Sequence, residues 1–336
     1  MHFKPIYFLA TLIVIITNGC LSSSQSDEQL NSTDITDAVF TNTSIDCGDY
    51  ADQYSSIVRD EQNNLIFDGA VTVVQFSDNC TISVNGIPNH DFNDESAHFA
   101  TDVSINSRIF TVERNPLKAS QTEELSQMYY DAVMLNGVVV DMLSAGCYKP
   151  NDAQADEDGN VQIGCSTEAD WLLDPLGTET KFGADAHNAH TQPDGTYHYH
   201  GNPLAMFDDE PGDQGSPVIG FAADGFPIYG SYFLDSETNE VRKVVSGYEL
   251  KSGSRPGPDS FDPGGSYDGT YIQDYEFTGN GDLDACNGMA VNGNYGYYVT
   301  DSYPWLMACF SGTANESFSK GQGKMKENVT LWMHEH

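Results

Sequence analysis

Histidines are concentrated in one short stretch of this chain, and imidazole nitrogen is a favoured ligand of transition metals. Four of the nine histidines fall within fourteen residues. His187 and His190 stand three residues apart, and His198 and His200 alternate with two tyrosines. The grouping predicts a site for Zn²⁺, Cu²⁺ or Fe²⁺, with Asp185 as an oxygen ligand or as a group that orients a ligand. The alternative is a polar network of buried histidines that holds no metal.

The local sequence predicts how these histidines are positioned. Pro193-Asp194-Gly195 is a turn signal, and the residues after Thr196 alternate between Tyr and His. In a strand, both histidines of that run project from one face while both tyrosines point the other way, into a core. His187 and His190 would share one side of a helical turn or loop. The intervening turn could then fold the two histidine pairs towards each other.

Two carboxylates are candidates for a catalytic base. Asp224 follows the apolar run Val218–Ala222, in the string Ala-Asp-Gly-Phe-Pro. Asp301 lies in the similar string Thr-Asp-Ser-Tyr-Pro. The string Asp-Gly-Thr-Tyr-x-Tyr also has a later parallel in Asn-Gly-Asn-Tyr-x-Tyr. We interpret these strings as a diverged internal repeat in which two similar hairpins pack together, with Asp224 and Asp301 in matching places. Each aspartate could equally cap its own turn.

Several strings of this chain carry a resemblance to known proteins, namely Gln192-Pro193-Asp194-Gly195 before Tyr197-His198-Tyr199-His200, Asn85-Gly86-Ile87-Pro88-Asn89-His90, Leu135-Asn136-Gly137-Val138, the eight residues ending at Gly230, Leu283-Asp284-x-Cys286-Asn287-Gly288 and Thr300-Asp301-Ser302-Tyr303-Pro304. They resemble the YHYH-domain family of exported bacterial proteins, over roughly residues 80 to 313. The resemblance implies one domain of this size, and no activity is established for the family. His90 lies inside a family-like string and joins the candidate ligands. Gly296 stands where similar members often carry a histidine, so metal chemistry is expected mainly at the first hairpin.

The first residues have the pattern of a lipoprotein leader. Lys4 precedes an apolar run, Ile6 to Ile16, that is too short to span a bilayer. Cys20 follows a small residue, as lipoprotein processing requires. We therefore predict a signal peptide over residues 1–19 and a lipid on Cys20 that anchors the protein to the bacterial cell envelope, at the outer membrane or cell surface. Secretion and an uncleaved membrane anchor are the alternatives.

The remaining chain is predicted to consist of a tether and one domain. Residues 20–43 are rich in Ser, Asp, Asn and Thr, so a flexible tether is expected there. Residues 44–336 are long enough for a single globular domain with a substantial core.

Six cysteines remain when Cys20 is set aside, an even number that favours three disulfides in an exported protein. Fifteen pairings are open to six cysteines. Neighbouring cysteines would close loops of modest length. These neighbouring pairs are Cys47 with Cys80, Cys147 with Cys165 and Cys286 with Cys309.

Composition favours a mainly β fold, a sandwich-like domain with a few short helices, and α+β is the alternative. The chain has 18 Tyr, 17 Phe and 31 Gly but few long amphipathic stretches. The best helical candidate is Ser120–Leu135. Loops are expected at Lys149–Asn160 and Ser252–Gly269. Strands are expected at Ala70–Phe76, Thr81–Val84, Arg108–Val112, Val138–Met142, Val218–Ala222, Phe226–Tyr229, Val241–Tyr248 and Val329–Met333.

The net charge of −36 argues against nucleic-acid binding, which needs a basic surface. Three kinds of function are compatible with the residues. The first is a metal-binding envelope protein, and the second is a metal-dependent hydrolase of a surface polymer, with Asp224 or Asp301 as base. The third is an adhesion or carbohydrate-binding module that uses Trp171 and Trp305. Calcium is a further candidate, at acidic loops such as residues 156–160 and 280–284. The protein or glycan partner stays open.

Overall fold

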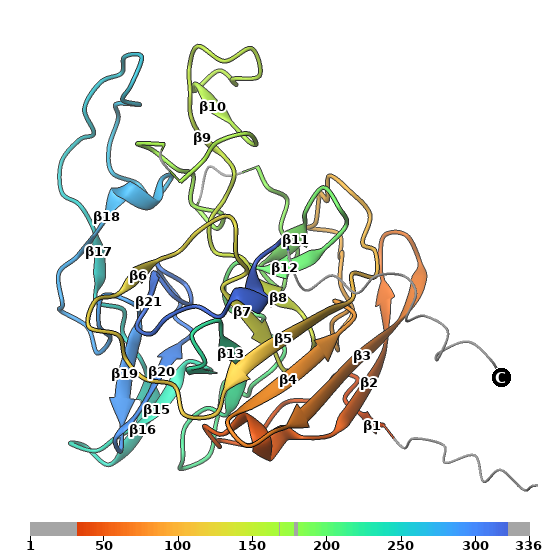
Figure 1. The fold of residues 1–336 in the computed structure, drawn as a ribbon. Coiled ribbons are helices and arrows are strands. Elements are labelled where there is room, and N and C mark those ends of the chain that lie inside the picture. Colours follow the sequence, from red (N-terminus) through yellow and green to blue (C-terminus); the bar gives the residue numbers. More distant parts are fainter. Residues whose placement is uncertain (1–31, 168, 178–180, 322–336) are drawn as a thin grey trace, which may run out of the picture. The chain divides into compact units, whose positions relative to one another are not determined.

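Two β-sheets share one hydrophobic core in the part of the chain that the computed structural model describes, residues 32–167, 169–177 and 181–321 (Figure 1). The mainly β prediction is therefore confirmed. The helical elements among these residues are short 3-10 turns, namely η1 (Cys47–Tyr50), η2 (Ile272–Asp274) and η3 (Glu316–Phe318).

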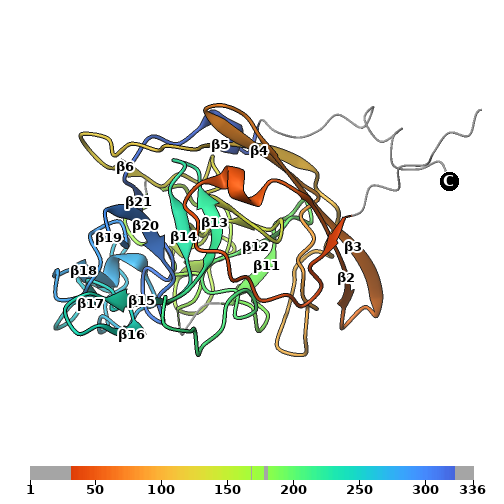
Figure 2. The ribbon, with the colours of Figure 1, turned by 90° about the horizontal axis from the view of Figure 1, so that it is seen from below.

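The first sheet is an antiparallel meander with one short parallel edge strand. Its order is β1-β2-β3-β4-β5. Alternate residues of β4 are buried, as expected for a sheet with one face on the core. Figure 2 shows β4 and β5 as a layer beside β11 to β14 of the second sheet. The strands are β1 (Thr33–Asp34), β2 (Gln53–Asp60), β3 (Leu65–Gln75), β4 (Asn79–Val84) and β5 (Arg108–Glu113).

Residues 32–43 belong to this folded unit, in contrast to the tether predicted over residues 20–43. Strand β1 pairs with β2, and the buried Asn89 side chain donates to the carbonyls of Ile35 and Ala38 at 2.9 and 3.1 Å. The Phe40 amide donates to the Met206 carbonyl at 2.9 Å. Ile35 and Phe40 supply the apolar contacts that the polar composition of this segment conceals.

The second sheet has eight strands in the order β11-β12-β8-β7-β13-β14-β20-β19. Most of its residues are buried, since the strands lie inside the molecule. Strand β13 carries an irregularity between Val218 and Gly220. The strands are β7 (Ala132–Met134), β8 (Val139–Val140), β11 (Ala189–Thr191), β12 (Tyr197–Tyr199), β13 (Val218–Ala222), β14 (Pro227–Tyr229), β19 (Gly288–Val291) and β20 (Asn294–Tyr298).

The two halves of this sheet follow the same plan. Each half contains two hairpins, and the second strand of one hairpin pairs in parallel with the second strand of the other, β12 with β8 and β20 with β14. The antiparallel pair β7·β13 joins the halves. The hairpins β11–β12 and β19–β20 therefore lie at opposite ends of the sheet and do not pack together. Asp224, in the turn between β13 and β14, takes the place that Asn136 takes between β7 and β8, so its match is not Asp301.

The helix predicted over Ser120–Leu135 is wrong. This stretch contains β6 (Glu123–Glu124), a turn and then β7. Strand β7 pairs with β8 and β13, and Ala132, Val133 and Met134 are all buried. A strand buried on both faces has no polar alternation that would reveal it.

The other predicted strands among the described residues are present, Val218–Ala222 with the predicted bounds and the rest with shifted ends. The exception is Val241–Tyr248, which divides into β16 (Glu240–Lys243) and β17 (Tyr248–Leu250). The strand predicted at Val329–Met333 lies outside the described residues. The remaining elements form two-stranded pairs, β9 (Cys147–Tyr148) with β10 (Asn160–Val161), β15 (Tyr232–Asp235) with β16, β17 with β18 (Tyr275–Phe277) and β6 with β21 (Cys309–Phe310).

Three disulfides join Cys47 to Cys80, Cys147 to Cys165 and Cys286 to Cys309, which are the neighbouring pairs. Disulfides persist in oxidising compartments, so the protein belongs outside the cytoplasm. No helix among the described residues is long and apolar enough to cross a membrane.

A buried carboxyl group, Asp174, holds the indole of Trp305, whose Nε1 donates to both carboxyl oxygens at 3.0 and 3.1 Å. Burial raises the pKa of Asp174 to about 6. The folded protein therefore keeps this proton to a higher pH than the unfolded chain, and Asp174 lowers stability as the pH rises from about 4 to about 6.

We expect Asp174→Asn to remove this loss, because the amide cannot ionise and still offers an acceptor to Trp305. The difference in free energy of unfolding between the variant and the wild type should increase by about 3 kcal/mol, in favour of the variant, from pH 4 to pH 7. Urea unfolding at several pH values measures this difference. A difference that does not change with pH would contradict the assignment.

Candidate functional site

The hairpin β11–β12 brings three histidines together. Gly195, with φ of +79°, allows the tight turn between the strands, and the Gln192 amide donates to the Thr196 carbonyl across it. In the resulting register His190 lies directly opposite His198. His200 follows two residues after His198, on the same side of the chain.

These three side chains, called the histidine triad below, are close enough to bind one ion. Nε2 of His190 lies 2.9 Å from Nε2 of His200, and the three ring centroids are 4.7 to 4.8 Å apart. One ligand atom from each residue lies within 4.8 Å of the other two. Nitrogens bound tetrahedrally to one Zn²⁺ at ~2.0–2.1 Å are about 3.3 Å apart, so small ring movements, together with transfer of the proton that one Nε2 donates to the other, would complete such a site.

Backbone carbonyls orient two of the rings. Nδ1 of His190 lies 2.7 Å from the Phe182 carbonyl, and Nδ1 of His198 lies 3.2 Å from the Thr196 carbonyl. Since a carbonyl only accepts, each Nδ1 carries the proton and Nε2 keeps its lone pair. This tautomer is the one that a metal-binding histidine uses when its other nitrogen is held by the protein.

The surroundings keep the histidine triad neutral. Burial lowers the pKa of His190, and the Phe182 carbonyl opposes that effect. Burial lowers the pKa of His198 much further, and the neighbouring His190 ring adds to the decrease. The pKa of His200 is also far below its usual value, because of burial and then of the two other rings. Neutral imidazole is the form that binds a metal.

One side of the histidine triad faces a cavity of about 420 Å³, called the triad pocket below. All three histidines line it, and so do Asp141 and Lys320. The Asp141 carboxylate accepts hydrogen bonds from the Lys320 ammonium and the Gln192 amide. A metal on the histidine triad could therefore keep a coordination position open to a ligand or to water, as catalytic zinc sites do.

A second aspartate lies behind Asp141. Burial, followed by the charge of Asp141, raises the pKa of Asp131 well above its usual value. Burial also raises the pKa of Asp141, although Lys320 opposes this. Asp131 accepts from the Met142 amide at 2.7 Å. The charge of Asp141 therefore disfavours ionisation of Asp131.

The other predicted ligands lie on the tyrosine side of β12. The rings of His90 and His187 stack with centroids 3.7 Å apart. Both nitrogens of His90 are occupied, Nε2 by the Tyr199 hydroxyl at 2.6 Å and Nδ1 by the Asp91 carbonyl at 2.7 Å. Asp185 accepts from the Tyr197 hydroxyl at 2.8 Å and from nearby backbone amides. Of the six candidate ligands, His190, His198 and His200 are the ones whose ligand atoms lie close enough together to hold one metal ion.

The two candidate bases lie elsewhere. Asp224 is buried and accepts from the Tyr297 hydroxyl at 2.6 Å and the Gly312 amide at 2.8 Å. Asp301 is 62 % exposed in its side chain and forms an ion pair with Lys243 at 2.8 Å. Neither lines the triad pocket.

Each acidic loop considered for calcium has a carboxylate that is held by protein groups. Asp156 accepts from two backbone amides of its own loop and pairs with Lys181 at 3.3 Å. Asp282 pairs with Arg242 at 2.7 Å. Among the described residues, a further group near metal-binding distance is Asp46 with Cys47 and Cys80, but both sulfurs belong to a disulfide.

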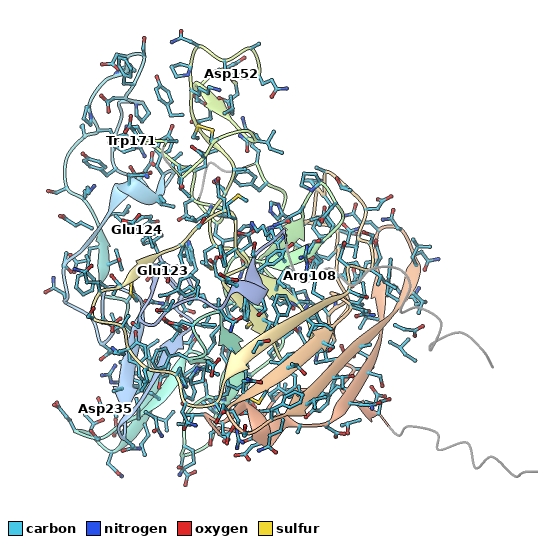
Figure 3. All side chains as sticks on the ribbon, in the orientation of Figure 1. Arg108, Glu123, Glu124, Asp152, Trp171 and Asp235 are labelled. Atoms are coloured by element: carbon cyan, nitrogen blue, oxygen red, sulfur yellow. A yellow bond between two sulfur atoms is a disulfide. The ribbon has the colours of Figure 1, made fainter. Side chains whose placement is uncertain are left out.

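Of the tryptophans proposed for a carbohydrate-binding face, Trp171 is buried and Trp305 is partly buried, and each donates a hydrogen bond to a carboxylate. Trp171, labelled in Figure 3, is 8 % exposed, packs edge to face on Tyr271 and donates to Asp262 at 3.0 Å. Trp305 is held by Asp174 as described above.

The hairpin in the other half of the sheet lacks the histidine triad. The cross-strand pair equivalent to His190 and His198 is Met289 and Gly296. The tyrosine side of this hairpin resembles that of β11–β12. The Tyr297 hydroxyl donates to Asp224, and the Tyr199 hydroxyl accepts from the Asn136 side chain. A metal site is therefore supported in one half of the sheet.

Sequence reasoning did not identify Asp141 and Lys320 as site residues. A signal for Asp141 was present, since a carboxylate interrupts the apolar run Val138–Met142. Lys320 is one of only 14 basic residues, but no local sequence pattern links it to His200, which lies 120 residues earlier.

Comparison with known proteins places the chain in a family. Neither the curated proteins nor the solved structures contain a match. The family model described as YHYH protein matches residues 109–312, which include the histidine triad and the whole eight-stranded sheet. Because this match covers more than half of the chain, the protein belongs to the YHYH protein family.

Proposed function

We propose that this exported YHYH protein binds one divalent transition metal through His190, His198 and His200. The observation that carries the proposal is the approach of three buried imidazoles to within 4.8 Å of one another. Their lowered pKa values leave them in the ligand form, and carbonyls orient two of the rings. Three nitrogen donors suit Zn²⁺, Cu²⁺ or Fe²⁺.

The proposal includes an open coordination position that faces the triad pocket. A metal bound there supplies Lewis acidity and a bound water of lowered pKa. The hydrolase hypothesis with Asp224 or Asp301 as base is not favoured, because neither residue lines this pocket. Metal binding for transport, storage or support of another envelope protein needs only the histidine triad.

The test is the metal content of purified protein. Residues 21–336 are prepared without added metal, dialysed against a mixture of divalent ions and analysed by mass spectrometry. We expect close to one transition metal per wild-type chain and almost none in His198→Ala/His200→Ala, because one imidazole rarely holds a metal alone. His187→Ala is the matched control, since its ring lies on the tyrosine side of β12.

Absence of metal from the wild-type protein, with folding intact, would refute the proposal. Equal metal content in the wild type and in His198→Ala/His200→Ala would mean that the metal binds elsewhere, at the acidic surface.

We also propose that a lipid on Cys20 anchors the protein to the bacterial envelope. The leader sequence, the small residue before Cys20 and the three disulfides support this location. Wild-type protein made in bacteria with a labelled fatty acid should carry the label and sediment with membranes. Cys20→Ser should carry no label and should remain in the leader-containing form. Label retained by Cys20→Ser would contradict the proposal.

A further inference from the structure

The face of the first sheet that points away from the core carries exposed aliphatic side chains. Side chains alternate between the two faces of a strand, and Val73 of β3 points into the core. Ile66 and Val74 of β3 therefore point outwards, as does Ile57 of β2, which is 63 % exposed. The register of β2 and β3 makes Ile57 and Ile66 diagonal neighbours. Exposed apolar groups gathered on one surface mark a contact with another molecule or with a membrane.

The outward side chains of β2, β3, β4 and β5, called the outer sheet face below, also differ in charge from the rest of the protein. Besides the aliphatic groups they are mainly Ser and Thr, such as Thr81 of β4 and Thr111 of β5. The charged members are Arg59, Asp68 and Glu113. The face is thus close to neutral, although the chain has 50 acidic and 14 basic residues. An anionic surface, which the net charge of −36 repels, meets little repulsion here.

The path of the chain brings this sheet near the predicted lipid. Strand β1 forms one edge of the sheet, where it pairs with β2. Cys20 stands 13 positions before Thr33, the first residue of β1. Because an extended chain spans at most ~3.6 Å per residue, a lipid on Cys20 would hold β1 within about 45 Å of the membrane. The anchored chain therefore enters the folded unit through the sheet that carries the outer sheet face.

We propose that the outer sheet face rests on the lipid surface of the membrane to which the protein is anchored. The inference rests on the proposed lipid at Cys20, since that lipid keeps the face near the bilayer. Ile57, Ile66 and Val74 enter the headgroup region, and the Ser and Thr hydroxyls exchange hydrogen bonds with the headgroups. Bacterial membranes are anionic, so a strongly acidic protein approaches them best through a face that is close to neutral.

The test is tryptophan quenching by brominated lipids, with residues 20–336 coupled to vesicles. Cys20 is the thiol that couples to a maleimide lipid, because the other six cysteines form the three disulfides. The vesicles contain phosphatidylethanolamine, phosphatidylglycerol and a phosphatidylcholine brominated in its acyl chains. Ile66→Trp and Val74→Trp should be quenched at least about 2-fold more than Phe261→Trp, because their rings would lie at the boundary between headgroups and acyl chains.

Phe261 is the matched control position, since it is 74 % exposed on a loop whose Asp262 accepts from Trp171. Coupled wild-type protein gives the background from the native tryptophans. Ser55→Asp/Thr81→Asp, added to Ile66→Trp, places two carboxylates on the outer sheet face. This change should lower the quenching to the level of Phe261→Trp, because the anionic vesicle then repels the face. Circular dichroism checks that each variant is folded, and Ile57→Trp replaces Ile66→Trp if that variant is not.

Equal quenching of folded Ile66→Trp and Phe261→Trp would overturn the inference. Weak quenching together with dimers in light scattering would also overturn it, because a second copy of the chain would then cover the face. The lipid is coupled chemically, so this test and the fatty-acid label on Cys20 can fail separately. Label without quenching refutes this inference and leaves the anchor standing. Quenching without label supports the outer sheet face as a membrane-binding surface and refutes the natural anchor.

Discussion

Zn²⁺ at ~1,000 times its dissociation constant should raise the free energy of unfolding of the wild-type protein by about 4 kcal/mol, and His190→Ala should abolish that gain. A ligand that binds only the folded state stabilises it by mass action. The histidine triad exists only when the register of β11 and β12 places His190 opposite His198. Removal of His190 leaves His198 in β12 and His200 just after it, without the cross-strand ligand.

The measurement is denaturant unfolding with added zinc and with a chelator. The control is again His187→Ala, which should keep the full zinc-dependent gain. This control matters because a chain with a net charge of −36 attracts divalent cations weakly over its whole surface. Equal zinc effects in the wild type and in His190→Ala would mean that surface binding, and not the histidine triad, causes the stabilisation.

The alternation Tyr-His-Tyr-His predicted the two faces of β12 because side chains of a strand alternate with a period of two. Membership of His190 in the histidine triad depends on the register of the hairpin, which the turn between Thr191 and Tyr197 sets. His187 precedes the strand, and Asn188 between them has a φ of +55°. This left-handed residue redirects the chain, so His187 stacks on His90 instead of joining His190.

Strands β3, β4 and β5 of the first sheet were predicted for the same reason, since one of their faces is buried, whereas β1 and β2 were not predicted. Strand β7 was not predicted either, because Ala132, Val133 and Met134 are buried on both faces and read as part of a helix. The triad pocket depends on contacts between distant residues. Asp141 and Lys320 are 179 positions apart, and no local pattern reports such a contact.

The largest effect on stability is expected at Arg255, far along the chain from the histidine triad. Its side chain is 6 % exposed, and it donates to both carboxylate oxygens of Asp274 at 2.7 and 2.6 Å and also to Asp268. The Asp274 side chain is fully buried and holds the loop before η2 through the amides of Gly269 and Tyr271. Arg255→Met should lower the free energy of unfolding by about 3–5 kcal/mol, because it leaves a buried carboxylate without its counter-ion.

The double variant Arg255→Met/Asp274→Asn distinguishes an unpaired charge from lost packing. The amide carries no charge and still accepts from the loop amides, so it should recover a large part of the lost stability, as denaturant unfolding would show. No recovery would mean that the guanidinium acts mainly through packing on Tyr271, over whose ring it lies at 4.8 Å. Neither residue lines the triad pocket, so metal content should stay near one per chain in both variants below their unfolding temperatures. Loss of metal from folded Arg255→Met would instead show that the η2 region and the histidine triad are energetically coupled.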